Sequence, residues 1–217
     1  MPTIGVVLAG CGNVDGSEIH EATLTLLHLD RAGVRVRCFA PEATTFGVFD
    51  YVKRVATSEE RSVYAEAARI ARGALMPLSK AGANELDALI LPGGQGAAKN
   101  LCDWIPKGPE ARVDPELAAL IRAMNEAHKP MGFICIAPVI AALVLGEKGV
   151  KVTIGNDPVT AAAIERCGAR HEARGVDEIC VDETLRVVTT PAYMLGPGIA
   201  DIDRGIGRLV AQVVAFC

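Results

Sequence analysis

The sequence has 217 residues, of which half are apolar and 22 % are charged, and its charges are spread along the whole length. No apolar run approaches the ~18–20 residues that span a bilayer, and the net charge of −4 comes without a basic block, so we expect no membrane and no nucleic-acid partner. The length suits one domain, residues 1–217, with a substantial buried core.

The first half of the sequence alternates short β-branched or aliphatic runs with stretches of helical periodicity. In chain order it predicts a strand over 4–9, a helix over 18–31, a strand over 34–39, a helix over 58–72, a short extended piece over 75–78 and a strand over 86–91. Residues 40–84 are otherwise irregular. The first strand is followed at once by polar residues and has no basic leader, so we expect no signal peptide.

The second half continues the same alternation after an excursion or lid over residues 97–113. It predicts a helix over 115–128, a strand over 130–135, a helix over 138–145, an extended piece over 150–154, a helix over 158–167, strands over 178–181 and 185–190 and a helix over 198–216. Asp114 is a natural N-cap and Pro115 a natural first residue of its helix. The alternation predicts an α/β protein with a mainly parallel sheet and helices on both faces.

The cysteines form an odd, scattered set at positions 11, 38, 102, 135, 167, 180 and 217. There is no CxxC pair and no Cys/His cluster with zinc-ligand spacing, so we expect no metal site and no other cofactor. A disulfide framework is typical of small secreted domains. We therefore expect reduced thiols, most of them buried, and a cytoplasmic location.

Cys135 differs from the other cysteines because it lies where a strand of bulky residues runs directly into a helix-starting Ala-Pro. Ligands of open α/β sheets bind at the carboxyl ends of strands. A helix N-terminus at this position stabilises a thiolate, which predicts a lowered pKa for the thiol. The tight turn also directs backbone N–H groups, including that of Ile136, at an anion formed nearby. We interpret Cys135 as the nucleophile.

Two further segments supply partners for this thiol. Gly93 and Gly94 follow a predicted strand directly, and glycines there allow close backbone approach and a second N–H for an oxyanion hole. The same turn resembles a phosphate cradle only weakly, because neither P-loop nor GxGxxG spacing is met.

The other segment opens the first helix, with Asp15 or Ser17 as its expected N-cap. Glu18 and Glu21 lie one turn apart there. Glu21 stands where the pattern asks for an apolar residue, and an inward carboxyl group needs a polar partner such as a thiol. His20 is a candidate proton shuttle beside it, and Glu18 a candidate substrate-binding residue.

Together these segments resemble the ElbB-like proteins, described as isoprenoid-biosynthesis proteins with an amidotransferase-like domain, in the PfpI and Parkinson-disease deglycase superfamily related to class I glutamine amidotransferases. The resemblance covers essentially the whole chain and is carried by residues 10–21, 86–100, 132–138 and 188–195. It implies a flavodoxin-like three-layer αβα sandwich, a homodimer, and a nucleophilic Cys135 hydrogen-bonded to Glu21.

The sequence departs from many members of this superfamily in its histidines. Ile136 follows the cysteine where others have histidine, and residues 153–157 contain none. The late His-x-Glu pair of amidotransferases is also absent from residues 190–193. His28, His128 and His171 lie outside the segments that form the site, so only the tertiary fold could bring them near it. Glutamine hydrolysis and Cys-His peptidase chemistry are therefore not expected.

The resemblance implies a glutathione-independent glyoxalase that converts glyoxal or methylglyoxal to glycolate or lactate through Cys135, with Glu21 or His20 moving the proton. Its substrate would be a small dicarbonyl compound. The missing histidine leaves an alternative open, in which the protein is non-catalytic or senses oxidants through the same thiol. A link to isoprenoid metabolism rests on the family name alone.

Overall fold

A computed structural model describes residues 1–45, 47–196 and 198–217. Its centre is a seven-stranded sheet of order β10-β11-β7-β6-β1-β2-β5. These strands are β1 (Thr3–Val7), β2 (Arg35–Ala40), β5 (Leu75–Pro77), β6 (Ala88–Leu91), β7 (Met131–Ile134), β10 (Cys180–Asp182) and β11 (Val187–Thr190). All neighbours pair in parallel except β10, which is antiparallel to β11 at the edge.

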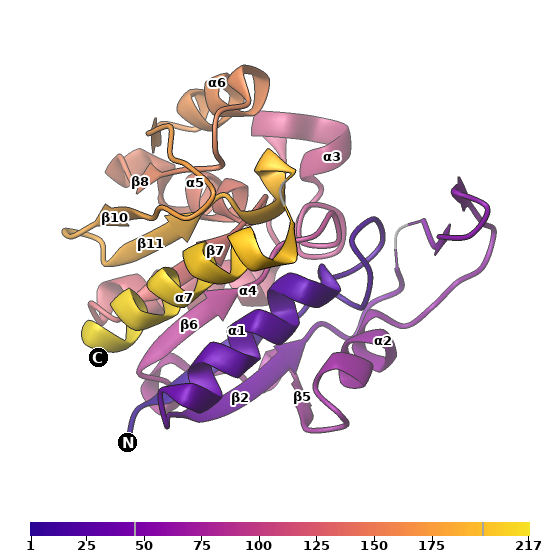
Figure 1. The fold of residues 1–217 in the computed structure, drawn as a ribbon, viewed down its shortest axis with the longest axis horizontal. Helices are drawn as coiled ribbons and strands as arrows, with labels where there is room; N and C mark the ends of the chain where they lie inside the picture. The colour runs from indigo at the N-terminus through magenta and orange to yellow at the C-terminus, as the bar shows by residue number, and fades with distance from the viewer. Residues whose placement is uncertain (46, 197) are drawn as a thin grey trace.

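Helices cover both faces of this sheet (Figure 1). They are α1 (Ile19–Arg31), α2 (Val63–Ile70), α3 (Trp104–Lys107), α4 (Pro115–Glu126), α5 (Pro138–Leu145), α6 (Pro158–Arg166) and α7 (Ile199–Ala215). α1 and α7 lie side by side on one face, and α4 and α5 cover the other. The predicted α/β fold, a mainly parallel sheet between two helical layers, is confirmed.

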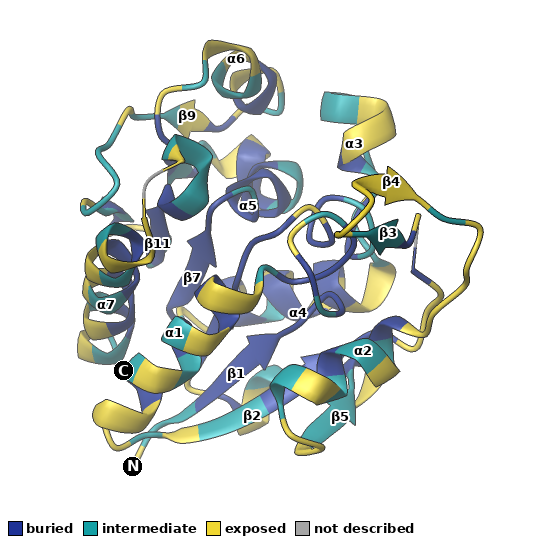
Figure 2. Ribbon diagram, turned by 45° about the vertical axis from the view of Figure 1, so that its right-hand side comes forward, coloured by how far each residue is buried: buried dark blue, intermediate teal, exposed yellow. Residues whose placement is uncertain are grey.

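The side chains of β1 show how the two hydrophobic cores are separated. Ile4 and Val6 belong to the core under α1 and α7, whereas Val7 belongs to the core under α4 and α5. This alternation is the period-two geometry of a strand that is buried on both faces. Figure 2 shows β1, β7 and β11 almost wholly in the colour of buried residues.

Several boundaries differ from the sequence prediction. The helix predicted over 58–72 begins only at Val63, because the Ser62 side chain caps it by accepting from the Ala65 N–H. The piece predicted over 150–154 is the two-residue β8 (Lys151–Val152), which pairs with β9 (Arg170–His171) outside the main sheet. A small hairpin of β3 (Phe49–Asp50) and β4 (Val55–Ala56) was not predicted.

None of the helices among the described residues has both the length and the apolar character needed to cross a bilayer.

Candidate functional site

Cys135 lies at the tight turn between β7 and α5, as the sequence predicts. Its φ of +63° is in the left-handed region, which non-glycine residues adopt rarely and mostly where surrounding contacts hold the chain. Here the Cys135 N–H donates to the Thr190 carbonyl at 2.9 Å and thereby ties the turn to the end of β11. The side chain is 7 % exposed, and this small exposed part opens into a pocket.

Glu21 lies buried behind the thiol, on the first turn of α1. Its carboxyl oxygens accept the N–H of Gly93 at 3.1 Å and the N–H of Tyr193 at 3.2 Å, and the carboxyl group is hydrogen-bonded to the Cys135 thiol. Burial, reinforced by the charge of Glu18, raises the pKa of Glu21 to about 8, although these hydrogen bonds act to lower it. Burial therefore favours the neutral, protonated form of Glu21.

The thiol does not have the lowered pKa that its place at a helix N-terminus predicts. Burial raises the pKa of Cys135 above its ordinary value, and the charge of Glu21 adds to this effect. The backbone N–H groups of Gly94 and Ile136 are hydrogen-bonded to the sulfur and act in the opposite direction. The prediction is wrong because the desolvation of a buried anion outweighs the helix terminus and the two amides.

The glycine turn after β6 meets Cys135 at very short range. A Cβ on Gly93 would lie 2.4 Å from the Cβ of Cys135 and 2.6 Å from Oε2 of Glu21, so no side chain fits there. Gly94 has a φ of +89° and directs its N–H at the sulfur. Of the two predicted oxyanion glycines, Gly94 thus faces the thiol together with Ile136, whereas the Gly93 N–H is held by Glu21.

The first helix begins differently from the prediction. Glu18 itself is the N-cap, since its Oε2 accepts the Glu21 N–H at 2.8 Å. Neither expected cap serves this purpose, because Ser17 Oγ accepts the Ala9 N–H at 2.8 Å and Asp15 binds the β3–β4 hairpin. Ser17 thus closes the loop after β1 on itself, whereas Asp15 joins that loop to a hairpin that the sequence pattern does not place beside it.

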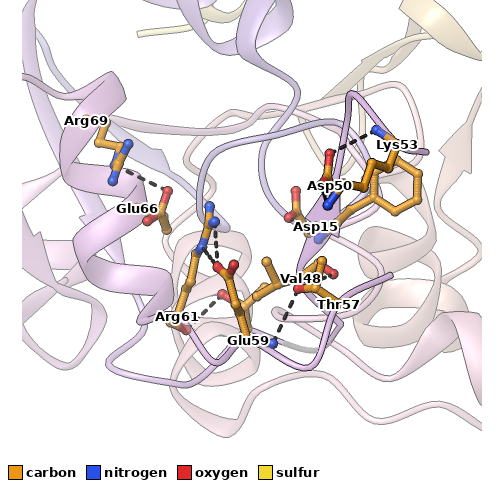
Figure 3. Close-up of polar contacts among 11 residues, drawn as sticks. Asp15, Val48, Asp50, Lys53, Thr57, Glu59, Arg61, Glu66 and Arg69 are labelled. Carbon is orange, nitrogen blue, oxygen red and sulfur yellow. Dashed lines mark hydrogen bonds and ion pairs between the residues drawn. The ribbon is translucent and has the colours of Figure 1, made fainter. Parts of the chain in front are cut away.

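The hairpin is held to the site loop by the buried carboxylate of Asp15. Oδ2 accepts the Phe49 N–H at 2.8 Å, and Oδ1 accepts the Tyr51 hydroxyl at 2.7 Å. Figure 3 shows Asp15 close to the hairpin, beside the ion pair of Lys53 with Asp50. The same loop reaches the glycine turn, where the Gln95 N–H donates to the Asn13 carbonyl at 2.7 Å.

The pocket above Cys135 has a volume of about 620 Å³. Its lining contains four predicted site residues, Glu18, His20, Gly94 and Ile136, in addition to the thiol. It also contains residues that sequence reasoning did not assign, namely Asn13, Gln95, Ile105, Tyr193 and Met194. Ile105 comes from α3, so the excursion over 97–113 contributes to the rim.

Tyr193 is the most informative of the residues that were missed. Its hydroxyl lies 2.8 Å from Nδ1 of His20, while its N–H donates to Glu21. Ala192 has a φ of +43°, so the chain turns sharply just after β11 and brings Tyr193 back over α1. A sequence signal existed, because the segment follows a parallel strand and ends at the same edge of the sheet as Cys135.

The other three histidines lie outside the pocket lining. His28 pairs with Asp203 between α1 and α7 at 2.8 Å, and His171 Nε2 accepts the Ile154 N–H at 3.4 Å. His128 lies between α4 and β7, at the opposite end of β7 from Cys135. Within the described residues, no cluster of three or more His, Cys, Asp or Glu side chains is arranged to hold a metal ion.

Comparison with known proteins finds relatives that match nearly the whole of this chain, whereas no family model matches it. It is 42 % identical over 221 residues to the ES1 protein homolog, mitochondrial, of Rattus norvegicus, with 97 % of this chain and 82 % of the relative covered. The same identity and coverage hold for the glutamine amidotransferase-like class 1 domain-containing protein 3, mitochondrial, of Homo sapiens.

Solved structures give the same picture of the fold. An isoprenoid biosynthesis protein with amidotransferase-like domain from Ehrlichia chaffeensis superposes with a TM-score of 0.92 and 34 % identity, covering 99 % of this chain and 100 % of that chain. A DJ-1 superfamily protein from Agrobacterium tumefaciens shares the fold at a TM-score of 0.60 and 15 % identity, covering 100 % of this chain and 92 % of that one.

The expectation of a cytoplasmic location is contradicted by these relatives, because the rat, human and zebrafish proteins are all named as mitochondrial. Reduced thiols and an acidic surface describe a folded domain and do not identify the compartment that holds it.

Proposed function

The chain belongs to the family of the ES1 and glutamine amidotransferase-like class 1 domain-containing proteins, and from this premise we propose that it is a cysteine-dependent glyoxalase that needs no glutathione. Its substrates are small dicarbonyl compounds, which it converts to hydroxy acids. The observation that carries the proposal is the Cys135 thiol, which is largely buried but lines a pocket and is hydrogen-bonded from behind to a carboxyl group whose pKa is about 8.

The first step is addition of Cys135 Sγ to the aldehyde carbon. The carbon–sulfur bond forms as the C=O π pair moves to oxygen, and the thiol proton passes through Glu21 to that oxygen, giving a hemithioacetal. A carboxyl group with a pKa near the working pH both accepts and returns a proton readily. The N–H groups of Gly94 and Ile136 stabilise the negative charge on sulfur during the transfer.

The second step moves the hydrogen of the former aldehyde carbon to the neighbouring carbonyl carbon through an enediol. The first carbon is oxidised to a thioester as the second is reduced to an alcohol, so no external oxidant is needed. Water then cleaves the thioester and restores the thiol. His20 lines the pocket and is hydrogen-bonded to Tyr193, so it is placed to move the proton between the two substrate carbons. Glu21 is instead buried beside the sulfur.

The proposal predicts that the purified protein converts glyoxal without added thiol and that Cys135→Ser abolishes this conversion. Formation of the hydroxy acid is measured by chromatography or NMR, and it should be lost in Cys135→Ser. Cys217→Ser is the matched control, because that cysteine is exposed at the end of the chain and lies outside the pocket lining. Equal rates for the wild type and Cys135→Ser would refute the enzymatic proposal.

The redox alternative receives less support from the geometry. Oxidation by peroxide follows thiolate character and exposure, and Cys135 is 7 % exposed with a raised pKa. Mass spectrometry after mild peroxide separates the two functions. Oxidation of Cys135 ahead of the exposed Cys217 would favour the sensor, especially if glyoxal is not consumed.

Location and assembly complete the proposal. We extend to this protein the mitochondrial location given in the names of its relatives. We retain the homodimer as part of the proposal, and sedimentation velocity of the purified chain tests it, since a monomer at micromolar concentration would contradict it.

A further inference from the structure

The charges around the pocket are unbalanced. Glu18 is the one acidic side chain in the lining, and the described lining contains no lysine or arginine. Glu21, just beneath the sulfur, adds a second carboxyl group. The remaining lining is neutral or apolar apart from His20.

The cations nearest along the chain have partners of their own. Lys99 Nζ donates to the Val14 carbonyl at 2.8 Å behind the site loop. Lys107, on the rim helix α3, forms an ion pair with Asp103 at 2.5 Å. Neither is among the residues that line the pocket, so the described lining offers an entering anion no ammonium or guanidinium group to offset the charge of Glu18.

Glu18 is held firmly in this position. Its own N–H donates to the Gly93 carbonyl at 3.0 Å, and its Oε2 accepts the Glu21 N–H. After burial, its charge is the next cause that raises the pKa of Glu21, and it also raises the pKa of Tyr193. Its field therefore reaches groups on both sides of the pocket.

We propose that Glu18 makes the pocket charge-selective, so that neutral or cationic carbonyl compounds reach Cys135 while carboxylates and phosphorylated aldehydes are disfavoured. The inference deepens the proposed function and rests on it, because the carbonyl compounds are substrates only if the protein is a glyoxalase. The charge selection itself is a property of the pocket, and it can be measured without any turnover. Glu18 is thus a specificity-determining residue.

The test compares alkylation of Cys135 by neutral iodoacetamide and anionic iodoacetate at mildly alkaline pH, with the modified Cys135 peptide quantified by mass spectrometry. Both reagents attack the same thiolate, so the ratio of their rates cancels the thiol pKa and its burial. We expect the rate with iodoacetamide divided by the rate with iodoacetate to be larger for Cys135 than for 2-mercaptoethanol, a neutral free thiol. In Glu18→Gln it should fall ~3- to 10-fold toward that reference, because one charge has been removed.

Asp30→Asn is the matched control, since it removes one negative charge from the exposed last turn of the same helix. That position lies about 18 Å from Glu18 along the helix, which is beyond the screening length. Its ratio should equal that of the wild type. A melting curve verifies that Glu18→Gln folds, because glutamine keeps an oxygen for the Glu21 N–H.

Three results would overturn the inference: a wild-type ratio equal to that of 2-mercaptoethanol, a ratio unchanged in Glu18→Gln, or no reaction of Cys135 with either reagent. Turnover of phenylglyoxal against 4-carboxyphenylglyoxal gives the catalytic counterpart, and the wild type should favour the neutral compound by a similar factor. Selective alkylation without glyoxal conversion would refute the glyoxalase proposal and support the charge selectivity of the pocket. Glyoxal conversion without selective alkylation would support the glyoxalase proposal and refute the charge selectivity.

Discussion

At the scale of single residues, Glu21 couples the site to pH. Its pKa is raised from 4.5 to about 8, so between these pH values the folded protein holds a proton that the unfolded chain releases. The free energy of unfolding therefore falls as pH rises through this window, by on the order of 5 kcal/mol, and is flat with respect to this group outside it. Denaturant unfolding across pH 4.5 to 8 measures the slope.

Glu21→Gln should flatten that slope. Its absolute stability should also be lower, because the amide nitrogen faces one of the two backbone N–H groups that the carboxyl oxygens accept. Glu126→Gln, exposed on α4, is the control and should keep the wild-type slope. A Glu21→Gln slope as steep as that of the wild type would assign the pH dependence to another group.

The close contact of Gly93 with Cys135 predicts the effect of adding a side chain at position 93. Gly93→Ala would place a Cβ 2.4 Å from that of Cys135, so the nucleophile or the turn must move by about 1 Å. A displacement of this size lowers turnover about 100-fold, and overpacking costs about 1–3 kcal/mol of stability. The measurements are glyoxal conversion and thermal unfolding.

Gly198→Ala is the matched variant for that experiment. A Cβ at Gly198 would meet only Asp201 Oδ2, at 3.8 Å, and the φ of −74° suits alanine. Its turnover should equal that of the wild type. If Gly93→Ala also retained full activity, the close approach of the glycine turn to the thiol would not be needed for turnover.

At the scale of elements, the β3–β4 hairpin is held to the site loop by the hydrogen bonds of Asp15 and Tyr51. A two-stranded hairpin this short is not stable alone, and Tyr51 joins it to the buried Asp15. Burial and Asp15 raise the pKa of Tyr51 to about 12, so the hydroxyl keeps its proton at neutral pH. Tyr51→Phe should cost about 1–3 kcal/mol and speed tryptic cleavage after Lys53 and Arg54 several-fold.

Tyr64→Phe is the control for this element, because its hydroxyl donates to the Leu75 carbonyl beside α2 instead. Cleavage of the hairpin should then proceed at the wild-type rate. If Tyr51→Phe were cut no faster than the wild type, the contact with Asp15 would not be what holds the hairpin.

The same element shows where sequence reasoning stops. The buried strands and α4 were predictable, because apolar runs and the Asp114-Pro115 start are local signals. The hairpin was not, since its order comes from Asp15 across 34 positions of sequence. The cap of α1 was misassigned for a related reason, because Ser17 accepts the Ala9 N–H within the same loop and Asp15 is engaged by the distant hairpin.

At the scale of the whole molecule, the topology explains why the site residues could be grouped without coordinates. Parallel strands end at one edge, so the turns after β1, β6, β7 and β11 gather there. Cys135 and the glycine turn were predicted on this basis, whereas Glu21 was predicted from its place in an apolar helical pattern and from the family resemblance. The fold brings all three together. The direction of the Cys135 pKa shift was missed because it depends on the burial of the thiol, which only the packed fold determines.

Asp87, just before β6, has a consequence for handling the protein. Its carboxylate accepts the Thr3 N–H at 2.7 Å, and its carbonyl is 3.9 Å from Sγ of Cys217, so both ends of the chain meet at one residue. Both termini lie near the amino-terminal ends of the central strands, whereas Cys135 follows the carboxyl end of β7 (Figure 1). A surface tether fused to either end would therefore present every molecule with its pocket facing the solution, an orientation suited to immobilised sensors and flow reactors.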